Sequence, residues 1–261
     1  PEVDCVSVLT NLETHREYAE MAMQAGKHVL VEKPAGASRD EVASMQRCAE
    51  ACGVQCVPVH NYVYEPALER TRALLDRGDL GRLVSVDVLY NIHHPEAVAQ
   101  RYPGVIRQIM THHAYVLLYL AGVPVSVAGM KSTINDGSVA QENLAVATLQ
   151  LQGGGVAHLH ASFAADDHSG DPWTFLVKVI GTEGSTRFSY RDWVQNRRAQ
   201  VHSHTFSAYP FHIERTVHHF LDGCVRRGEA PLSSMQDAYD AQRIIEAVEA
   251  SIDQQRILRL T

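Results

Sequence analysis

Strands of the buried type alternate with amphipathic helices through residues 3–59. The run VDCVSVLT at 3–10 is apolar and β-branched, and shorter runs of the same kind occupy 28–31 and 54–59. Such runs are typical of strands that are buried on both faces of a sheet. The intervening stretches, 11–25 and 39–51, place apolar residues at helical spacing. Strands that alternate with helices predict a parallel, doubly wound α/β sheet.

Capping residues support these boundaries. Gly26 and Gly53 follow the two helical stretches, where glycine commonly ends a helix. Ser38 precedes the second stretch as an N-cap residue, and the acidic Asp40 and Glu41 in the first turn suit the helix dipole.

After a helix expected at 66–77, the periodicity becomes alternating. Period-two segments, each predicted to be a strand, lie at 83–91, 126–134, 144–152, 156–163 and 173–180. Helical stretches at about 106–120, 211–227 and 234–254 interrupt and then close this series. We therefore predict an α+β domain with a large open, antiparallel-rich sheet and helices on one face. The expected division is 1–62 for the doubly wound part and 63–261 for the second domain.

Composition excludes several classes of partner. The 261 residues carry a formal net charge of −7 and have a pI near 6.1, so we expect neither nucleic acid nor an anionic membrane as a partner. No apolar run reaches the roughly 18 residues that a membrane span requires.

The cysteines and histidines predict no metal site. Cys48, Cys52 and Cys56 are spaced by four, which matches no known metal-ligand spacing. Free thiols fit a reducing compartment, so we expect the protein in the cytoplasm. The fifteen histidines fall partly in pairs but form no His-Glu-x-x-His motif, and we interpret most of them as surface or hydrogen-bonded core residues.

The end of the second strand carries the most specific motif. Residues 25–34 read AGKHVLVEKP, which places Lys33 and Pro34 where doubly wound sheets bind ligands. Taken alone, Lys33 could equally be a solvated lysine at a strand end. The string, however, resembles the second motif of the Gfo/Idh/MocA oxidoreductases. Segments similar to that family follow along nearly the whole chain, at 1–15, 60–68, 78–83, 181–184 and 233–260.

The resemblance implies a Rossmann domain that binds NAD or NADP, followed by a substrate and oligomerisation domain. The family transfers hydride between the nicotinamide and a hydroxyl or carbonyl carbon of a sugar, cyclitol or similar small molecule. It implies that Lys33 polarises the substrate oxygen and that His112 exchanges the hydroxyl proton, with His113 as the alternative in a shifted register. It also implies a homo-oligomer, a dimer or tetramer.

Further site residues follow from the same resemblance. Those expected on the cofactor side are Thr10, Asn11, His15, Glu32, Lys33 and Pro34. Those expected on the substrate side are Tyr62, Tyr64, His93, Arg107, Gln108, His113 and His160. Two alternatives stay open here: Tyr62 and Tyr64 could be core residues, and His160 with His158 could face an oligomer partner.

The sequence departs from the family pattern in three places. Gln108 stands where the family has an aspartate, and Tyr115 where it has an acidic residue three positions after the histidine. No Gly-x-Gly-x-x-Gly turn, which would cradle a pyrophosphate, occurs in the 261 residues. We expect the chain to be part of a longer protein. The alternatives are a cofactor-free lyase, isomerase or cyclase on the same scaffold, and a non-catalytic assembly subunit.

Overall fold

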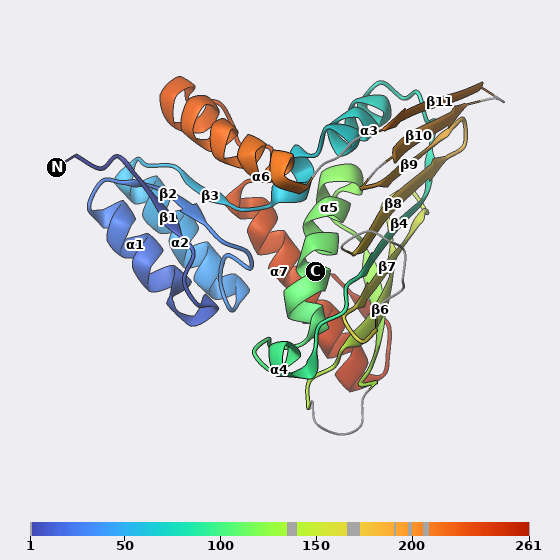
Figure 1. Ribbon diagram of the computed structural model, residues 1–261, viewed down its shortest axis with the longest axis horizontal. Coiled ribbons are helices and arrows are strands. Elements are labelled where there is room, and N and C mark those ends of the chain that lie inside the picture. The colour runs from blue at the N-terminus through green and yellow to red at the C-terminus, as the bar shows by residue number, and fades with distance from the viewer. Residues whose placement is uncertain are drawn as a thin grey trace. The chain divides into compact units, whose positions relative to one another are not determined.

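A computed structural model describes residues 2–134, 140–165, 173–190, 192–197, 200–205 and 209–260. The first elements form a three-stranded parallel sheet in the order β1-β2-β3, with helices between its strands (Figure 1). Their bounds are β1 Cys5–Val8, α1 His15–Gln24, β2 His28–Val31, α2 Arg39–Cys52 and β3 Cys56–Pro58. The predicted parallel α/β sheet is confirmed.

The packing of this sheet explains its sequence pattern. Val29 and Val31 of β2 are fully buried and pack with Met23 of α1 and Met45 of α2 in one apolar cluster. Ser38 caps α2 as expected, because its Oγ accepts a hydrogen bond from the backbone N–H of Glu41. The caps and the apolar spacing together fix where each helix begins and which face it buries.

The remaining strands form a second, mixed sheet. Within the described residues it has nine strands in the order β11-β10-β9-β8-β4-β7-β6-β5-β12. Their bounds are β4 Leu83–Asn91, β5 Ser126–Ser132, β6 Leu144–Gln150, β7 Val156–Ser162, β8 Thr174–Gly181, β9 Ser185–Ser189, β10 Asp192–Arg197, β11 Gln200–Thr205 and β12 Leu258–Arg259. All pairs are antiparallel except the central one, β4 with β7. The large antiparallel-rich sheet is confirmed, and the strands expected at 144–163 are β6 and β7.

Helices line one face of this sheet (Figure 1). They include α3 Pro66–Asp76, the π-helix η3 Ile106–Met110, α5 Thr111–Ala121 and the end of α7 Met235–Gln254; the short α4 Glu96–Ala99 precedes η3. Val86, Val88 and Tyr90 alternate inward along β4 and are buried, whereas Asp87 and Leu89 between them are only partly buried. The other face therefore carries the partly exposed set of side chains. No described helix is both long and apolar enough for a membrane crossing.

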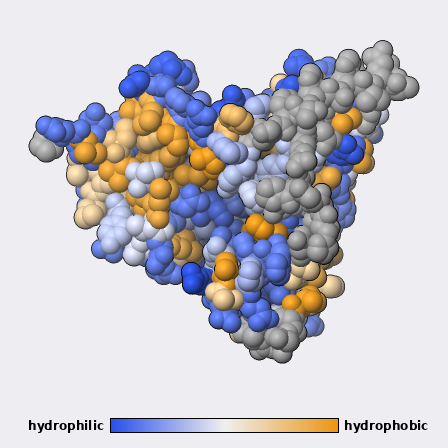
Figure 2. Space-filling view, in the orientation of Figure 1, coloured by the Kyte–Doolittle hydropathy of each residue, from blue (hydrophilic) through white to orange (hydrophobic). Residues whose placement is uncertain are grey.

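The contacts divide the chain into two compact units. The first unit comprises 1–65 and 210–243, and the second comprises 66–209 and 244–261. The segment 210–243 contains α6 Tyr209–His218, the π-helix η4 His219–Arg226 and the start of α7. This segment packs with the parallel sheet because Phe220 and Cys224 bury themselves against Leu30 and Val57. Figure 2 shows a broad hydrophobic area on the visible face of this unit. Leu9 and Phe211 are among the exposed large apolar side chains of the unit.

Candidate active site

Two loops meet at the carboxyl edge of the parallel sheet. The register pairs Val8 with Val31, so the turn at Thr10–Asn11 and the loop at Glu32–Pro34 both leave the sheet at that edge. The backbone N–H of Glu32 donates to the carbonyl of Val8 at 2.9 Å, which keeps the two loops adjacent. The side chains of Thr10 and Asn11 are exposed. Because ligands bind at the carboxyl ends of parallel strands, this edge is the candidate ligand site of the first unit.

His15 contacts both loops through its two ring nitrogens. It is 2% exposed, and its Nδ1 lies 2.9 Å from the carbonyl oxygen of Pro34 while its Nε2 lies 3.0 Å from that of Thr10. Both ring nitrogens therefore contact the protein backbone. The expected cofactor residue is placed as a clamp between the loops, an arrangement that sequence reasoning did not anticipate.

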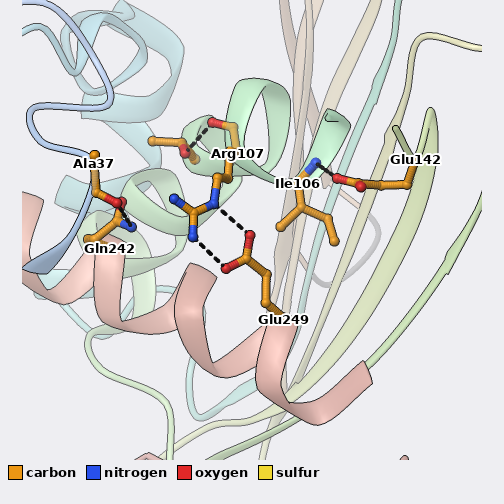
Figure 3. Close-up of polar contacts among 7 residues, drawn as sticks. Ala37, Ile106, Arg107, Glu142, Gln242 and Glu249 are labelled. Atoms are coloured by element: carbon orange, nitrogen blue, oxygen red, sulfur yellow. Dashed lines mark hydrogen bonds and ion pairs between the residues drawn. The ribbon is translucent and has the colours of Figure 1, made fainter. Parts of the chain in front are cut away.

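The loop beyond Pro34 is anchored to α7. The amide Nε2 of Gln242 donates to the carbonyl oxygen of Ala37 at 3.4 Å (Figure 3). The backbone N–H of Ala37 also donates to the carboxylate of Glu41 at 2.9 Å. These contacts, together with His15, hold the chain on either side of Lys33.

The peptide bond between Lys33 and Pro34 is cis, and Lys33 is only partly exposed. Burial lowers the pKa of Lys33 to about 8, and the carboxylate of Glu32 opposes this shift. Burial likewise raises the pKa of Glu32, against the charges of Lys33 and His15. An ammonium group that gains or loses its proton near neutral pH is suited to proton exchange as well as to charge stabilisation.

Buried polar groups surround the end of β3, and the sequence analysis missed most of them. His60 is 1% exposed, and its Nδ1 lies 2.6 Å from the hydroxyl of Ser233. Asn61 Nδ2 lies 3.0 Å from Nδ1 of the buried His212. The available signal was a polar pair, His60-Asn61, directly after a buried strand. Their partners lie 173 and 151 residues away, which no local pattern reveals.

Tyr62 and Tyr64 lie beside this cluster as core residues. They are 0% and 1% exposed. The ring of Tyr62 packs 5.1 Å from that of His212, and the carbonyl of Tyr64 accepts a hydrogen bond from Arg215 at 2.9 Å. Their burial supports the core alternative left open above over a direct substrate contact.

His112, in the second unit, lies in the first turn of α5, a turn whose residues are all buried. It is 8% exposed, and its Nδ1 lies 2.7 Å from the hydroxyl of Tyr115, one turn later. Its ring also packs 6.0 Å from that of Tyr90 on β4. The departure from the family pattern at Tyr115 therefore has a structural consequence: a phenol, in place of a carboxylate, orients the imidazole.

Arg107 is engaged by the protein itself. Its Nε and Nη2 donate to the two carboxylate oxygens of Glu249 at 2.7 and 2.9 Å (Figure 3). A bidentate pair of this kind occupies the face of the guanidinium that would bind an anionic ligand. The structure thus places this predicted substrate residue in an ion pair between η3 and α7. Gln108, its neighbour, is partly exposed.

The predicted histidines of the second unit lie in different environments. His113 is 0% exposed, and burial, followed by the charge of His160, lowers its pKa to about 3. His160 lies on the sheet face away from His112, because its neighbours Leu159 and Ala161 point inward. His93 is exposed after β4. Among the described residues, no group of three His, Cys, Asp or Glu side chains is placed to hold a metal ion.

Two family models match the chain in sequence. The model described as the oxidoreductase family with an NAD-binding Rossmann fold matches residues 1–60, and the Gfo/Idh/MocA C-terminal domain matches residues 68–187.

Relatives and solved structures agree with these matches. A 1-carboxy-3-chloro-3,4-dihydroxycyclohexa-1,5-diene dehydrogenase of Comamonas testosteroni is 35% identical over 32% of this chain and 21% of its own length. A 1,5-anhydro-D-fructose reductase of Ensifer adhaerens is 28% identical over 71% of this chain and 56% of its own. The chain thus spans less than two thirds of either relative. A levoglucosan dehydrogenase crystallised with NADH superposes with a TM-score of 0.88 at 20% identity, covering 100% of this chain and 81% of that one. This last likeness establishes the fold.

Proposed function

Because the chain belongs to the Gfo/Idh/MocA oxidoreductase family, we propose that it is the main part of an NAD(P)-dependent dehydrogenase or reductase. The substrate class we propose is a sugar, cyclitol or similar polar small molecule. The names of the relatives support this class, since one acts on an anhydro sugar and another on a cyclic diol.

The placement of Lys33 carries the proposal. It stands at the carboxyl edge of a parallel sheet, in a loop held by His15 and Gln242, with its pKa lowered to about 8 by burial. The nicotinamide end of NAD(P) fits this edge, because the side chains of Thr10 and Asn11 are exposed there while the backbone behind them is fixed. When bound, the nicotinamide supplies the hydride acceptor or donor.

The chain's own residues would then act on the oxygen of the substrate. The ammonium of Lys33 stabilises negative charge on that oxygen, as positioned charges do in many enzymes. His112 takes or returns the hydroxyl proton, since an imidazole titrates near neutral pH. Gln108 contributes hydrogen bonds only, because an amide side chain does not exchange protons in this range.

Two further properties belong to the proposal. We place the protein in the cytoplasm, which the five free cysteines support. We also propose a homo-oligomer, supported by the partly exposed second face of the large sheet.

The test is a turnover assay on the full-length protein. A panel of sugars and cyclitols is offered with NAD or NADP, and absorbance of the reduced nicotinamide is followed. Lys33→Met and His112→Ala should each lower kcat by about 100- to 10,000-fold, and Gln108→Ala by less. Lys131→Met, an exposed lysine of β5, serves as the matched control and should retain full activity. Wild-type turnover in both the Lys33 and His112 variants would refute these roles.

A further inference from the structure

The register of the parallel sheet places His60 beside Lys33. Strand β2 pairs Val29 with Cys56 and Val31 with Pro58, an offset of 27 residues (56 − 29). The N–H of Val59 still donates to the carbonyl of Val31 at 2.8 Å, so the pairing continues past the strand end. Lys33 and His60 each stand two residues beyond the paired Val31 and Pro58, and the chain turns at His60, whose N–H donates to the carbonyl of Pro58 at 2.8 Å. Adjacent strands are about 4.8 Å apart, and the charge of Lys33 acts on His60, so the two residues are neighbours at this edge of the sheet.

His60 is a neutral imidazole in this position. It is 1% exposed, and burial, followed by the positive charge of Lys33, lowers its pKa to about 3. A neutral imidazole has one donor nitrogen and one acceptor nitrogen. Its Nδ1 is already engaged by the hydroxyl of Ser233 at 2.6 Å. The second ring nitrogen, Nε2, is the atom that the Lys33 ammonium would contact.

Ser233 lies two residues before the start of α7. The next residue, Ser234, begins α7 with a capping box: its N–H donates to the carboxylate of Asp237 at 2.7 Å, and its Oγ accepts from the N–H of Asp237 at 3.2 Å. Met235 and Ala238 of the same turn are buried in the core of the parallel sheet. The helix start thereby fixes the hydroxyl that contacts His60.

We propose that His60, oriented by Ser233, is a positioning residue for the Lys33 ammonium. In this arrangement Nδ1–H of His60 donates to the Ser233 hydroxyl oxygen, and the lone pair of Nε2 accepts a hydrogen bond from Nζ of Lys33. The opposite tautomer would direct an N–H at a cation. The inference rests on the catalytic role proposed for Lys33 and adds how that side chain is directed.

The choice of a neutral acceptor has a chemical consequence. A carboxylate at position 60 would stabilise the ammonium strongly and raise the pKa of Lys33. A neutral imidazole directs the ammonium by one hydrogen bond without cancelling the effect of burial. Lys33 thereby stays aimed and still exchanges its proton near pH 8.

The experiment measures the titration of Lys33 by NMR in full-length protein labelled with ¹³C at the lysine ε-carbons. This chain contains four lysines, Lys27, Lys33, Lys131 and Lys178, so assignment by substitution is practical. His60→Phe removes the acceptor while keeping a ring in place. Its Lys33 midpoint should fall by about one pKa unit, the size expected for one lost hydrogen bond to a charged group. Ser233→Ala should shift it in the same direction.

Matched variants separate positioning from stability. Ser234→Ala removes the adjacent cap hydroxyl, so it should lower Tm but leave the Lys33 midpoint unchanged. Ser233→Thr retains a hydroxyl and should restore the wild-type midpoint. An unchanged midpoint in folded His60→Phe and Ser233→Ala would overturn the proposal, as would an equal shift in Ser234→Ala. If His60→Phe fails to fold, the comparison of Ser233→Ala with Ser233→Thr tests the proposal.

The titration is recorded without substrate or cofactor, so it stands apart from the turnover assay. If Lys33→Met proves fully active, the catalytic role fails, and the NMR midpoint still reports whether His60 directs the amine. If both hold, the alkaline fall in kcat should move with the midpoint in each variant.

Discussion

Tyr115 determines how His112 can exchange a proton. Its hydroxyl lies 2.7 Å from Nδ1. When Nδ1–H donates to this oxygen, Nε2 carries the lone pair that accepts a substrate proton. Tyr115→Phe removes that partner and keeps the ring, so kcat/KM should fall about tenfold, which corresponds to one hydrogen bond.

The matched control lies on the same helix. Tyr119→Phe makes the same chemical change one turn later, at a partly exposed position, and should leave kcat/KM unchanged. Equal losses in the two variants would show that the phenol of Tyr115 does not act through His112.

The sequence names candidate residues without showing their contacts. Lys33 and His112 are predicted from a local string and a helix pattern, and their roles stay predictions. Arg107 was predicted as a substrate residue, whereas the structure pairs it with Glu249. This partner lies 142 residues away in the chain, so no local pattern indicates it. His15 was predicted to bind the cofactor, whereas its two nitrogens contact backbone carbonyls, which carry no sequence signature.

Because His113 is buried, we expect the stability of the fold to decrease in acid. It is fully buried, neither ring nitrogen has a hydrogen-bond partner among the described residues, and its pKa is lowered to about 3. The unfolded chain binds a proton near pH 6.5, and the folded chain does not. The free energy of unfolding must therefore decrease as pH falls from about 6.5 towards 3.

The measurement is Tm at about pH 7 and about pH 5, on either side of the unfolded histidine pKa. His113→Leu removes one titrating group, so its Tm should fall less over this range than that of the wild type. Some dependence of Tm on pH should remain in this variant, because burial also lowers the pKa values of His60 and His212. A His113→Leu slope equal to the wild type would contradict the argument.

At the level of elements, the close approach of β5 to α7 depends on one glycine. A Cβ at Gly129 would lie 2.9 Å from Cγ1 of Ile252 and 3.1 Å from the carbonyl oxygen of Val248. The N–H of Gly129 also donates to Ser251 of the same helix at 3.1 Å. Gly129→Ala should therefore push the helix from the sheet and reduce the free energy of unfolding by about 1–3 kcal/mol.

Denaturant unfolding checks this prediction. A Gly129→Ala protein as stable as the wild type would show that α7 accommodates the methyl group without cost.

Whether a segment is a helix or a strand could be predicted from the sequence, because the spacing of its apolar residues is a local property. The alternation at 156–163 predicts β7, and the helical spacing at 106–120 predicts a helix, whose first turn is the π-helix η3. The partners of the strands did not follow. Parallel pairing of β4 with β7 joins Asp87 to His158 across 71 residues (158 − 87), and no local pattern encodes such a pair.

The whole molecule combines segments that are distant in the chain. Residues 210–243 belong by contact to the first unit, although their amphipathic pattern resembles that of any closing helix. The sequence shows that these helices need an apolar surface, and it does not show which one. Ser233 reaches His60 only because this segment returns to the parallel sheet.

The uncovered face of the large sheet has the composition of a contact surface. One row of paired residues crosses five strands with mainly apolar side chains: Met130, Val146, His160, Leu89 and Leu176. The next row is polar, with Thr148, His158, Asp87, Lys178 and Arg187. An apolar row bordered by polar side chains is the arrangement found in protein interfaces.

We therefore expect the full-length protein to form a dimer or tetramer through this face. Val146 is 39% exposed in the middle of the apolar row. Val146→Glu would bury an unpaired carboxylate in the interface, which is costly enough to separate the subunits. Light scattering at micromolar concentration should give a multimeric mass for the wild type and a monomeric mass for this variant. Val217→Glu, at an equally exposed valine (40%) on α6 of the other unit, should remain multimeric. A monomeric wild type, or a multimeric Val146→Glu protein, would exclude this face as the interface.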